Sequence, residues 1–150
     1  MVKKTKIFTG GTFDLFHSGH LNILREAKAA GDYLIVGVST DKLVNSYKEE
    51  PIMSYKHRID IIAHITYVDE VVAQHNLFDI EQFKQLGADY FVVGDDWKNN
   101  HTNVGLNWLR DNNKLKHFPY TKGLSTTIIK DKIIRNASHS IYEQLQAEKD

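Results

Sequence analysis

Residues 10–20, GGTFDLFHSGH, join the end of a strand pattern to the start of a helix pattern through a short turn. Glycine lets the backbone turn tightly and approach a ligand closely. The helix pattern begins near Ser18 or Gly19, and a helix N-terminus presents free N–H groups that attract anions, phosphate above all. His17 and His20 lie about one helical turn apart and can face the same ligand. This stretch therefore predicts a strand–turn–helix unit with an anion site at its turn.

Apolar runs and helical patterns alternate along the rest of the chain. This order predicts an α/β fold, a doubly wound, five-stranded parallel sheet with helices on both faces, Rossmann-like, with ligands bound beyond the carboxyl ends of the strands. Residues 42–51 are polar and irregular, and we expect a loop there. We expect strands near residues 4–10, 32–40, 67–72, 89–97 and 114–120, helices near 19–31, 54–65, 79–87 and 104–113, and a last helix entered within 121–135.

Length and composition favour one ordinary domain with no special partner. A chain of 150 residues is long enough for a sizeable core, and we expect the domain over residues 1–135 and a polar tail over 136–150. Lys plus Arg and Asp plus Glu are both 19, which argues against a nucleic-acid partner. The absence of cysteine excludes disulfide, zinc–thiolate and cysteine-nucleophile chemistry. No apolar run approaches about 18 residues, so we expect a cytoplasmic protein with no membrane partner.

The two histidines allow three readings. Imidazole can donate hydrogen bonds to phosphate oxygens, and in its protonated form it adds positive charge. Alternatively, His17 and His20 cap a helix or fill the core. The third option is a metal site, which we do not expect because no third ligand has suitable spacing.

A second anion site is predicted near the C-terminal end of the chain. Ser125, Thr126 and Thr127 follow Gly123-Leu124 and precede an apolar helical run. Their plain role is N-capping, but hydroxyls at a helix N-terminus can also hold phosphate. Two helix N-termini converging on one crevice would suit a triphosphate. The sequence contains neither a P-loop nor a G-x-G-x-x-G dinucleotide motif.

Together these stretches resemble a known superfamily. GTFDLFHSGH resembles the H-x-G-H signature of the nucleotidyltransferases, and GLSTT resembles their second signature before the last helix. SYKHRIDII, YVDEVV and GDDW are similar to the glycerol-3-phosphate cytidylyltransferase branch. The resemblance runs from about residue 7 to residue 135.

The resemblance implies a reaction and a set of catalytic residues. A phosphate monoester, glycerol-3-phosphate or a similar polyol or amino-alcohol phosphate, attacks the α-phosphorus of CTP, and pyrophosphate leaves. Mg²⁺ is carried by the nucleoside triphosphate, with few or no protein ligands. The protein is expected to be a homodimer. The catalytic residues implied are His17, His20, Ser125 and Thr126.

The resemblance also implies binding residues, several of which have an ordinary structural alternative. Asp14 could bind backbone in the turn, Arg58 could be a surface charge or an active-site brace, and Trp97 could pack beside the base or fill a gap. The implied nucleotide-binding residues are Gly11, Thr12, Phe13, Asp14, Gly19, Asp95, Tyr120, Gly123 and Thr127, and the implied substrate-binding residues are Lys48, Arg58 and Trp97.

Three basic positions of that branch are absent here. Tyr120 and Thr66 stand where the branch has arginines. Lys48 is the one basic residue in NSYKEEP, residues 45–51, where the branch has paired lysines. Tyrosine cannot supply a fixed guanidinium to a phosphate. Two alternatives therefore stay open: an ATP-dependent adenylyltransferase acting on a sugar or cofactor phosphate, and a nucleotide-binding sensor without turnover.

Overall fold

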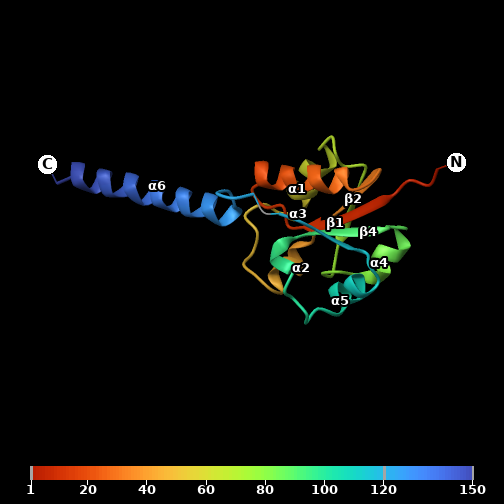
Figure 1. The fold of residues 1–150 in the computed structure, drawn as a ribbon. Helices are drawn as coiled ribbons and strands as arrows, with labels where there is room; N and C mark the ends of the chain where they lie inside the picture. Colours follow the sequence, from red (N-terminus) through yellow and green to blue (C-terminus); the bar gives the residue numbers. More distant parts are fainter. Residues whose placement is uncertain (1, 120, 150) are drawn as a thin grey trace.

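A computed structural model of the protein describes residues 2–119 and 121–149. Its centre is a five-stranded parallel sheet with the strand order β3-β2-β1-β4-β5 (Figure 1). The predicted fold class is confirmed. The strands are β1 (Lys6–Gly11), β2 (Tyr33–Ser39), β3 (Glu70–Gln74), β4 (Tyr90–Gly94) and β5 (Leu115–Phe118).

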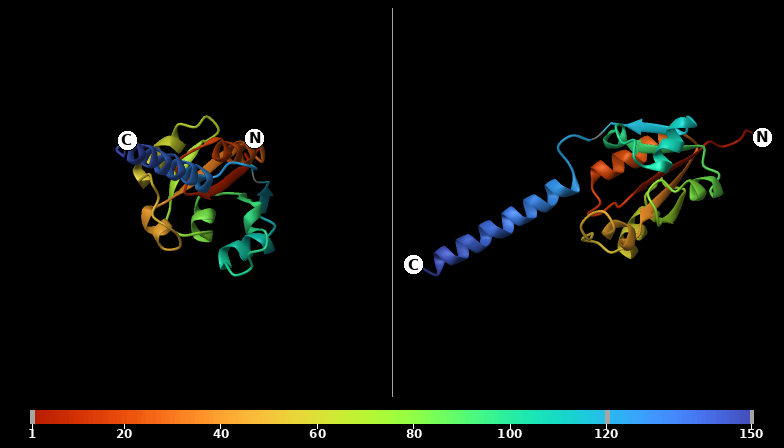
Figure 2. Two further views of the ribbon diagram at one scale, coloured as in Figure 1. Left: turned by 90° about the vertical axis from the view of Figure 1, so that its left-hand side faces the viewer. Right: turned by 90° about the horizontal axis from the view of Figure 1, so that it is seen from below.

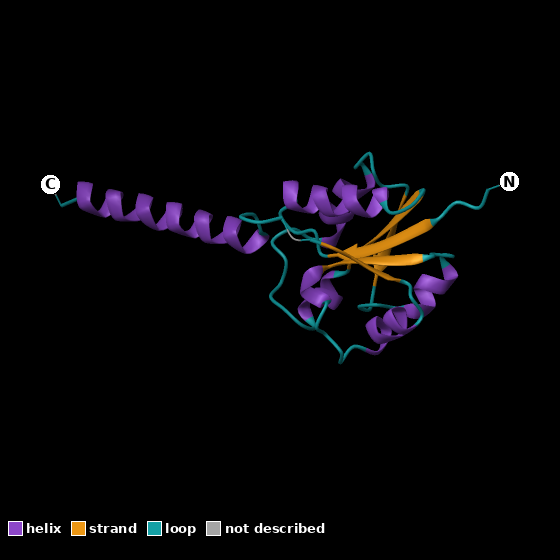
Figure 3. Ribbon diagram, in the orientation of Figure 1, coloured by secondary structure: helices purple, strands orange, loops and turns teal. Residues whose placement is uncertain are grey.

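Helices cover both faces of the sheet (Figure 3). Consecutive β1 side chains belong to opposite cores, since Ile7 packs in one cluster and Phe8 in the other. The Ile7 cluster includes residues of α1 (Ser18–Ala29) and α3 (Tyr55–Ala63), and the Phe8 cluster includes residues of α4 (Ile80–Gln85) and α5 (Val104–Asp111). A strand buried on both faces is typically apolar at successive positions, as Ile7 and Phe8 of β1 and Leu34, Ile35 and Val36 of β2 are.

The sheet has its topological switch point at β1. The chain passes from β1 to β2 and β3 on one side, and β4 and β5 lie on the other side. Connections that leave a central strand in opposite directions open a crevice at its carboxyl end. Gly11 and Gly94 end the two strands that border this crevice, β1 and β4.

Two local predictions are corrected. The start of the expected loop at 42–51 is a short helix, α2 (Asp41–Asn45), because the Thr40 hydroxyl caps it and Val44 is fully buried. The strand expected over residues 89–97 ends at Gly94, and residues 95–97 form a 3₁₀ turn, η1.

The last helix, α6 (Thr126–Ala147), projects away from the body of the protein (Figures 1 and 2). It is 22 residues long and continues without a break through residue 135. None of the described helices is long and apolar enough to cross a bilayer.

Candidate active site

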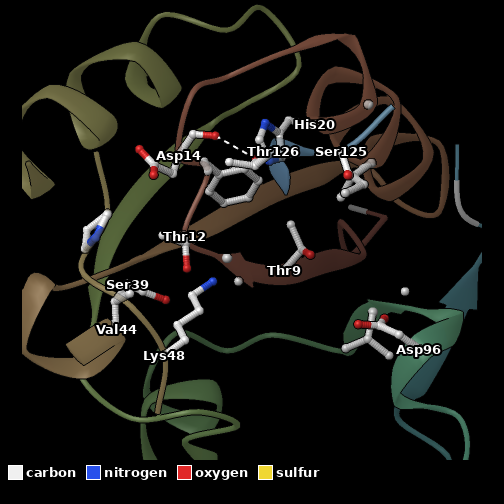
Figure 4. Close-up of a pocket in the computed structure, with 18 of the residues that line it drawn as sticks. Thr9, Thr12, Asp14, His20, Ser39, Val44, Lys48, Asp96, Ser125 and Thr126 are labelled. Carbon is white, nitrogen blue, oxygen red and sulfur yellow. Dashed lines mark hydrogen bonds between the residues drawn. The ribbon is translucent and has the colours of Figure 1, made fainter. Parts of the chain in front are cut away.

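A cavity of about 630 Å³ lies at the carboxyl ends of the strands, at the switch point. Its wall brings together the N-terminus of α1, the segment after α2, the end of β4 and the N-terminus of α6 (Figure 4). Most of the residues predicted from the sequence line it: Gly11, Thr12, Phe13, Asp14, His17, Gly19, His20, Lys48, Trp97, Ser125, Thr126 and Thr127.

The two histidines are helix caps and cavity residues at once. His17 is the N-cap of α1, and its Nδ1 accepts the Gly19 backbone N–H at 3.1 Å. His20 Nδ1 accepts the His17 backbone N–H at 3.2 Å. The two rings stack with centroids 3.8 Å apart. Because each Nδ1 accepts a hydrogen bond, each neutral imidazole carries its proton on Nε2.

Both histidines are held in the neutral form. Burial lowers the pKa of His17. Burial and then the neighbouring His17 lower the pKa of His20 to about 4; Asp14 opposes this shift, and Lys48 adds a smaller lowering effect. Both shifts favour the neutral form, in which each ring has an uncharged Nε2–H that can donate a hydrogen bond.

The second signature meets the first at this cavity. Thr126 Oγ1 donates to the Asp14 backbone carbonyl at 3.0 Å, and it lies 3.4 Å from His17 Nε2 (Figure 4). Ser125 Oγ caps α6 by accepting the Ile128 N–H at 3.1 Å. The N-termini of α1 and α6 thus converge on one space, and both attract anions.

The Asp14 carboxylate holds the turn together. Phe13 and Leu15 have φ angles of 55° and 48°, in the left-handed region that side-chain-bearing residues rarely adopt. The Asp14 carboxylate accepts the backbone N–H groups of Leu15, Ile52 and Met53. These contacts match the structural role considered for Asp14, in which its carboxylate binds backbone in the turn. Asp14 also lines the cavity.

Arg58 does not line the cavity, and its assignment to the substrate is corrected. Its side chain is fully buried, and its guanidinium donates to the carbonyls of Met53, Thr12 and Ser39. It also pairs with the Asp41 carboxylate at 2.7 Å. These contacts make Arg58 a brace for the segments that form the cavity wall.

Two of the predicted nucleotide-binding residues do not line the cavity, and a third is outside the residues that the structure describes. Asp95 is exposed on η1, and its neighbour Asp96 lines the cavity instead. Gly123 has a φ of 79° and forms the turn before α6, which explains a glycine there without ligand contact. Tyr120 lies outside the described residues.

Lys130 was missed by the sequence reasoning. It lines the cavity, and its Nζ lies 3.8 Å from Asp14 Oδ2. It follows Thr126 by four residues, so both share one face of α6. That spacing was the available signal, and Lys130 supplies a cation near the second signature.

Gln74 was also missed, although it ends β3 and so belongs to the expected edge of the sheet. The side chain is 3 % exposed, and its Oε1 accepts the Ser39 hydroxyl at 3.0 Å. A Cβ on Gly10 would collide with the Gln74 amide. Glycine at position 10 therefore allows the amide to occupy this position. Gln74 Nε2 has no hydrogen-bond partner among the described residues, and the residue lines the cavity. The amide therefore offers N–H donors to a ligand.

Comparisons with known proteins identify the family of this chain. The family model described as cytidylyltransferase-like matches residues 8–134. The chain is 42% identical over 132 residues to a glycerol-3-phosphate cytidylyltransferase of Bacillus subtilis, covering 85% of this chain and 96% of that protein. It is 34% identical over 132 residues to the Staphylococcus aureus protein of the same name, covering 85% of this chain and 94% of that protein. It is also 35% identical to part of a bifunctional protein HldE of Helicobacter pylori, covering 88% of this chain and 28% of that protein.

A solved structure shows the same fold. The lipopolysaccharide core biosynthesis protein from Thermoplasma volcanium superposes with a TM-score of 0.67 at 23% identity, covering 80% of this chain and 98% of that chain. The sequence resemblance is confirmed by the family match and by relatives aligned over nearly their whole length. This chain belongs to the cytidylyltransferase-like family.

Proposed function

We propose that the protein transfers a cytidylyl group from CTP to glycerol-3-phosphate and releases pyrophosphate. The observation that carries the proposal is a cavity where the N-termini of α1 and α6 converge, in a chain 42% identical to a glycerol-3-phosphate cytidylyltransferase over 96% of that protein. The intact signature residues at both helix starts favour turnover over a sensor role.

The chemistry needs charge stabilisation more than proton transfer. A phosphate oxygen of the acceptor forms a bond to the α-phosphorus of CTP. The bond from that phosphorus to the bridging oxygen breaks, and pyrophosphate leaves with the electron pair. The attacking group is already an anion, so no strong general base is required. His17 and His20 would donate through Nε2–H to the α-phosphate as its charge grows. The Ser125 hydroxyl and the backbone N–H of Thr126 at the start of α6 would bind the leaving phosphates.

We treat Mg²⁺ as part of the nucleotide substrate. Among the described residues, no three His, Cys, Asp or Glu side chains come together as a metal site. The Asp14 carboxylate already accepts three backbone N–H groups. Triphosphate oxygens would therefore hold the ion, which neutralises part of their charge.

The two sides of the cavity suit different parts of the substrates. Trp97 packs edge-on against Phe78 with centroids 4.8 Å apart, and this aromatic wall would suit the base. Lys48 enters from the side of Ser39 and Val44, opposite Asp96 (Figure 4). We assign Lys48 to the acceptor phosphate and Lys130 to the nucleotide phosphates, because Lys130 adjoins Thr126. These lysines would replace part of the missing basic charge.

A pyrophosphate-release assay tests the proposal. CTP and ATP are each combined with glycerol-3-phosphate, with amino-alcohol phosphates, and with sugar or cofactor phosphates. We expect release with CTP and glycerol-3-phosphate at a kcat/KM at least about ten-fold above every other pair. Pyrophosphate release with ATP and an acceptor, but not with CTP, would establish the adenylyltransferase instead. Nucleotide binding by calorimetry without any release would establish the sensor.

The ATP-dependent reaction is the second candidate. The chain is 41% identical over 96 residues to an FAD synthase of Thermococcus sibiricus, covering 63% of this chain and 65% of that protein. FAD contains an adenylyl group, so a related chain named for that product favours this alternative. The tyrosine and threonine at positions 120 and 66 favour it as well.

We also propose that the protein is a homodimer in the cytoplasm. Its nucleoside triphosphate substrate is a cytoplasmic metabolite, and a chain with no cysteine needs no oxidising compartment. The dimer is supported by a large exposed apolar surface on α6.

A further inference from the structure

The segment that leads into α6 has few contacts that hold it to the body of the protein. Among the described residues, no backbone group of residues 121–124 pairs with another backbone group. No residue of α6 is buried, so core packing does not fix the position of the helix either. The start of α6 nevertheless has to lie opposite the start of α1, because the proposed phosphate site uses both helix N-termini.

Side-chain hydrogen bonds join this segment to the body at each of its ends. At the C-terminal end, Thr126 Oγ1 donates to the Asp14 backbone carbonyl at 3.0 Å. At the N-terminal end, Asn22 Nδ2 donates to Thr121 Oγ1 at 3.1 Å. Asn22 belongs to α1 and is half-buried. Residues 121–126 are therefore tied to the first signature at one end and to its helix at the other.

Arg25 and Tyr67 fix the direction of the Asn22 amide. The Arg25 guanidinium donates to Asn22 Oδ1, and because a guanidinium has no acceptor, the amide nitrogen must face Thr121. Arg25 Nε also donates to the Tyr67 hydroxyl at 3.1 Å, and the guanidinium lies 5.6 Å from the centre of the Tyr67 ring. Tyr67 packs against the core cluster that contains Ile7. A series of side-chain contacts therefore leads from this core to Thr121.

The bond from Asn22 also determines what the Thr121 hydroxyl can do. Because its oxygen accepts the amide N–H, the hydrogen of the hydroxyl is free to point elsewhere. Thr121 lines the cavity, and no acceptor for its hydroxyl lies among the residues that the structure describes. The hydroxyl can therefore donate to a phosphate oxygen of a ligand. Asn22 does not line the cavity, so its effect on a ligand passes through Thr121.

We infer that Asn22 is a positioning residue for the reaction. It holds Thr121 and the residues that follow so that the Thr121 hydroxyl and the N-terminus of α6 face the triphosphate of CTP. The inference rests on the proposed function, since the triphosphate has to bind between the two helix starts. Asn22 belongs to neither signature, and its effect falls on the nucleotide and not on the acceptor, which is assigned to the side of Lys48.

Steady-state kinetics separate this role from a purely structural one. Asn22→Leu and Thr121→Val each remove one partner of the bond and nearly keep the side-chain size. We expect either to raise the KM of CTP about five- to ten-fold, with the acceptor KM within about two-fold and the melting temperature within about 4 °C of the wild type. The double variant should be no worse than Thr121→Val, because the two residues act as one unit. Thr121→Ser restores a hydroxyl, and its KM for CTP should be at least about three-fold below that of Thr121→Val.

Hydrogen exchange of the ligand-free protein gives a test that does not depend on the reaction. The amides of residues 121–130 should exchange at least about two-fold faster in Asn22→Leu than in the wild type. The matched control is Gln85→Leu, which replaces an exposed amide on α4 outside the cavity and should leave this exchange unchanged.

Unchanged exchange in Asn22→Leu, or KM effects that multiply in the double variant, would overturn the positioning role. A rise in the acceptor KM equal to that of CTP would overturn the assignment to the triphosphate. If the wild type did not turn over CTP but Asn22→Leu still exchanged faster, the proposed function would fail while the contact of Asn22 with the segment stood.

Discussion

At the scale of single residues, each of the two cavity histidines binds the backbone through one ring nitrogen and has a second nitrogen that the proposed reaction would use. The Nδ1 atoms of His17 and His20 accept backbone N–H groups at the start of α1. This hydrogen bond fixes the ring and leaves the Nε2–H as the donor. Capping and the proposed ligand binding, which are alternatives from the sequence, are therefore compatible, because the cap orients the donor.

His17→Asn separates these two tasks. Asparagine can still accept the Gly19 N–H with its side-chain oxygen, so the helix keeps its cap. It has no group that reaches the Nε2 position. We expect kcat to fall about 100-fold, the typical cost of losing one preorganised donor, with the melting temperature unchanged. Steady-state kinetics and thermal unfolding of the same sample check this, and wild-type kcat would contradict the mechanism.

The low pKa of His20 predicts how stability depends on pH. The pKa is about 4 in the folded protein and 6.5 in an unperturbed histidine. Below pH 6.5 the unfolded state takes up a proton that the folded state does not bind, so stability is full above 6.5 and declines toward pH 4. When the pH is lowered from 7 to 5, we expect the unfolding free energy of the wild type to fall by about 1–2 kcal/mol more than that of His20→Asn. Urea unfolding at both pH values measures this, and equal losses would refute it.

At the scale of elements, Arg58 joins three parts of the chain that are distant in sequence. From α3 it reaches the turn after β1, the end of β2 and the start of α2. Arg58→Met would leave buried carbonyls and the Asp41 carboxylate without their donor, and we expect a loss of about 3–5 kcal/mol of stability.

Lys48→Met provides the contrasting variant for Arg58→Met. Lys48 lines the cavity, and burial followed by the nearby Lys130 lowers its pKa. We expect Lys48→Met to raise the acceptor KM about ten-fold and to leave urea unfolding unchanged. If Arg58→Met folded normally and raised only KM, Arg58 would be a substrate ligand and not a structural brace.

The end of β3 predicts a further substrate contact. Gln74 is tied to Ser39 at the end of β2, and the Gln74 carbonyl accepts the N–H of Thr40, the N-cap of α2. This places its free amide on the Lys48 side of the cavity. We expect Gln74→Met, which keeps the length but removes the donors, to raise the acceptor KM about five- to ten-fold with little change in the KM of CTP. An effect confined to CTP would place the amide on the nucleotide instead.

At the scale of the whole molecule, the body and most of α6 are energetically separate. The cores lie on the two faces of the sheet, and none of the α6 residues belongs to them. A chain ending at Arg135 keeps Ser125, Thr126 and Lys130. We expect it to keep its melting temperature within about 4 °C and its CTP affinity. Calorimetry checks this, and a large fall in melting temperature would show that residues 136–150 belong to the domain.

The local pattern of the sequence was sufficient for the fold and for the edge of the sheet that carries the site. Alternating apolar periods predict the order of strands and helices, and parallel strands bring their carboxyl ends to one edge. The turn before His17 and the hydroxyls before α6 could therefore be placed together from the sequence. Their roles followed from the family resemblance. Helix capping is local as well, which is why both signatures mark helix starts.

The tertiary structure alone decided which polar side chains reach the cavity. Arg58 and Gln74 are far apart in the sequence from the groups they bind, and burial of a polar side chain depends on partners that no local pattern contains. The same holds for Asp95 and Asp96, where the η1 turn brings the second carboxylate, and not the first, to the cavity wall. The sequence contains the apolar residues of α6, but only the folded structure shows that they are exposed, because the same residue pattern occurs in helices whose apolar side chains are covered.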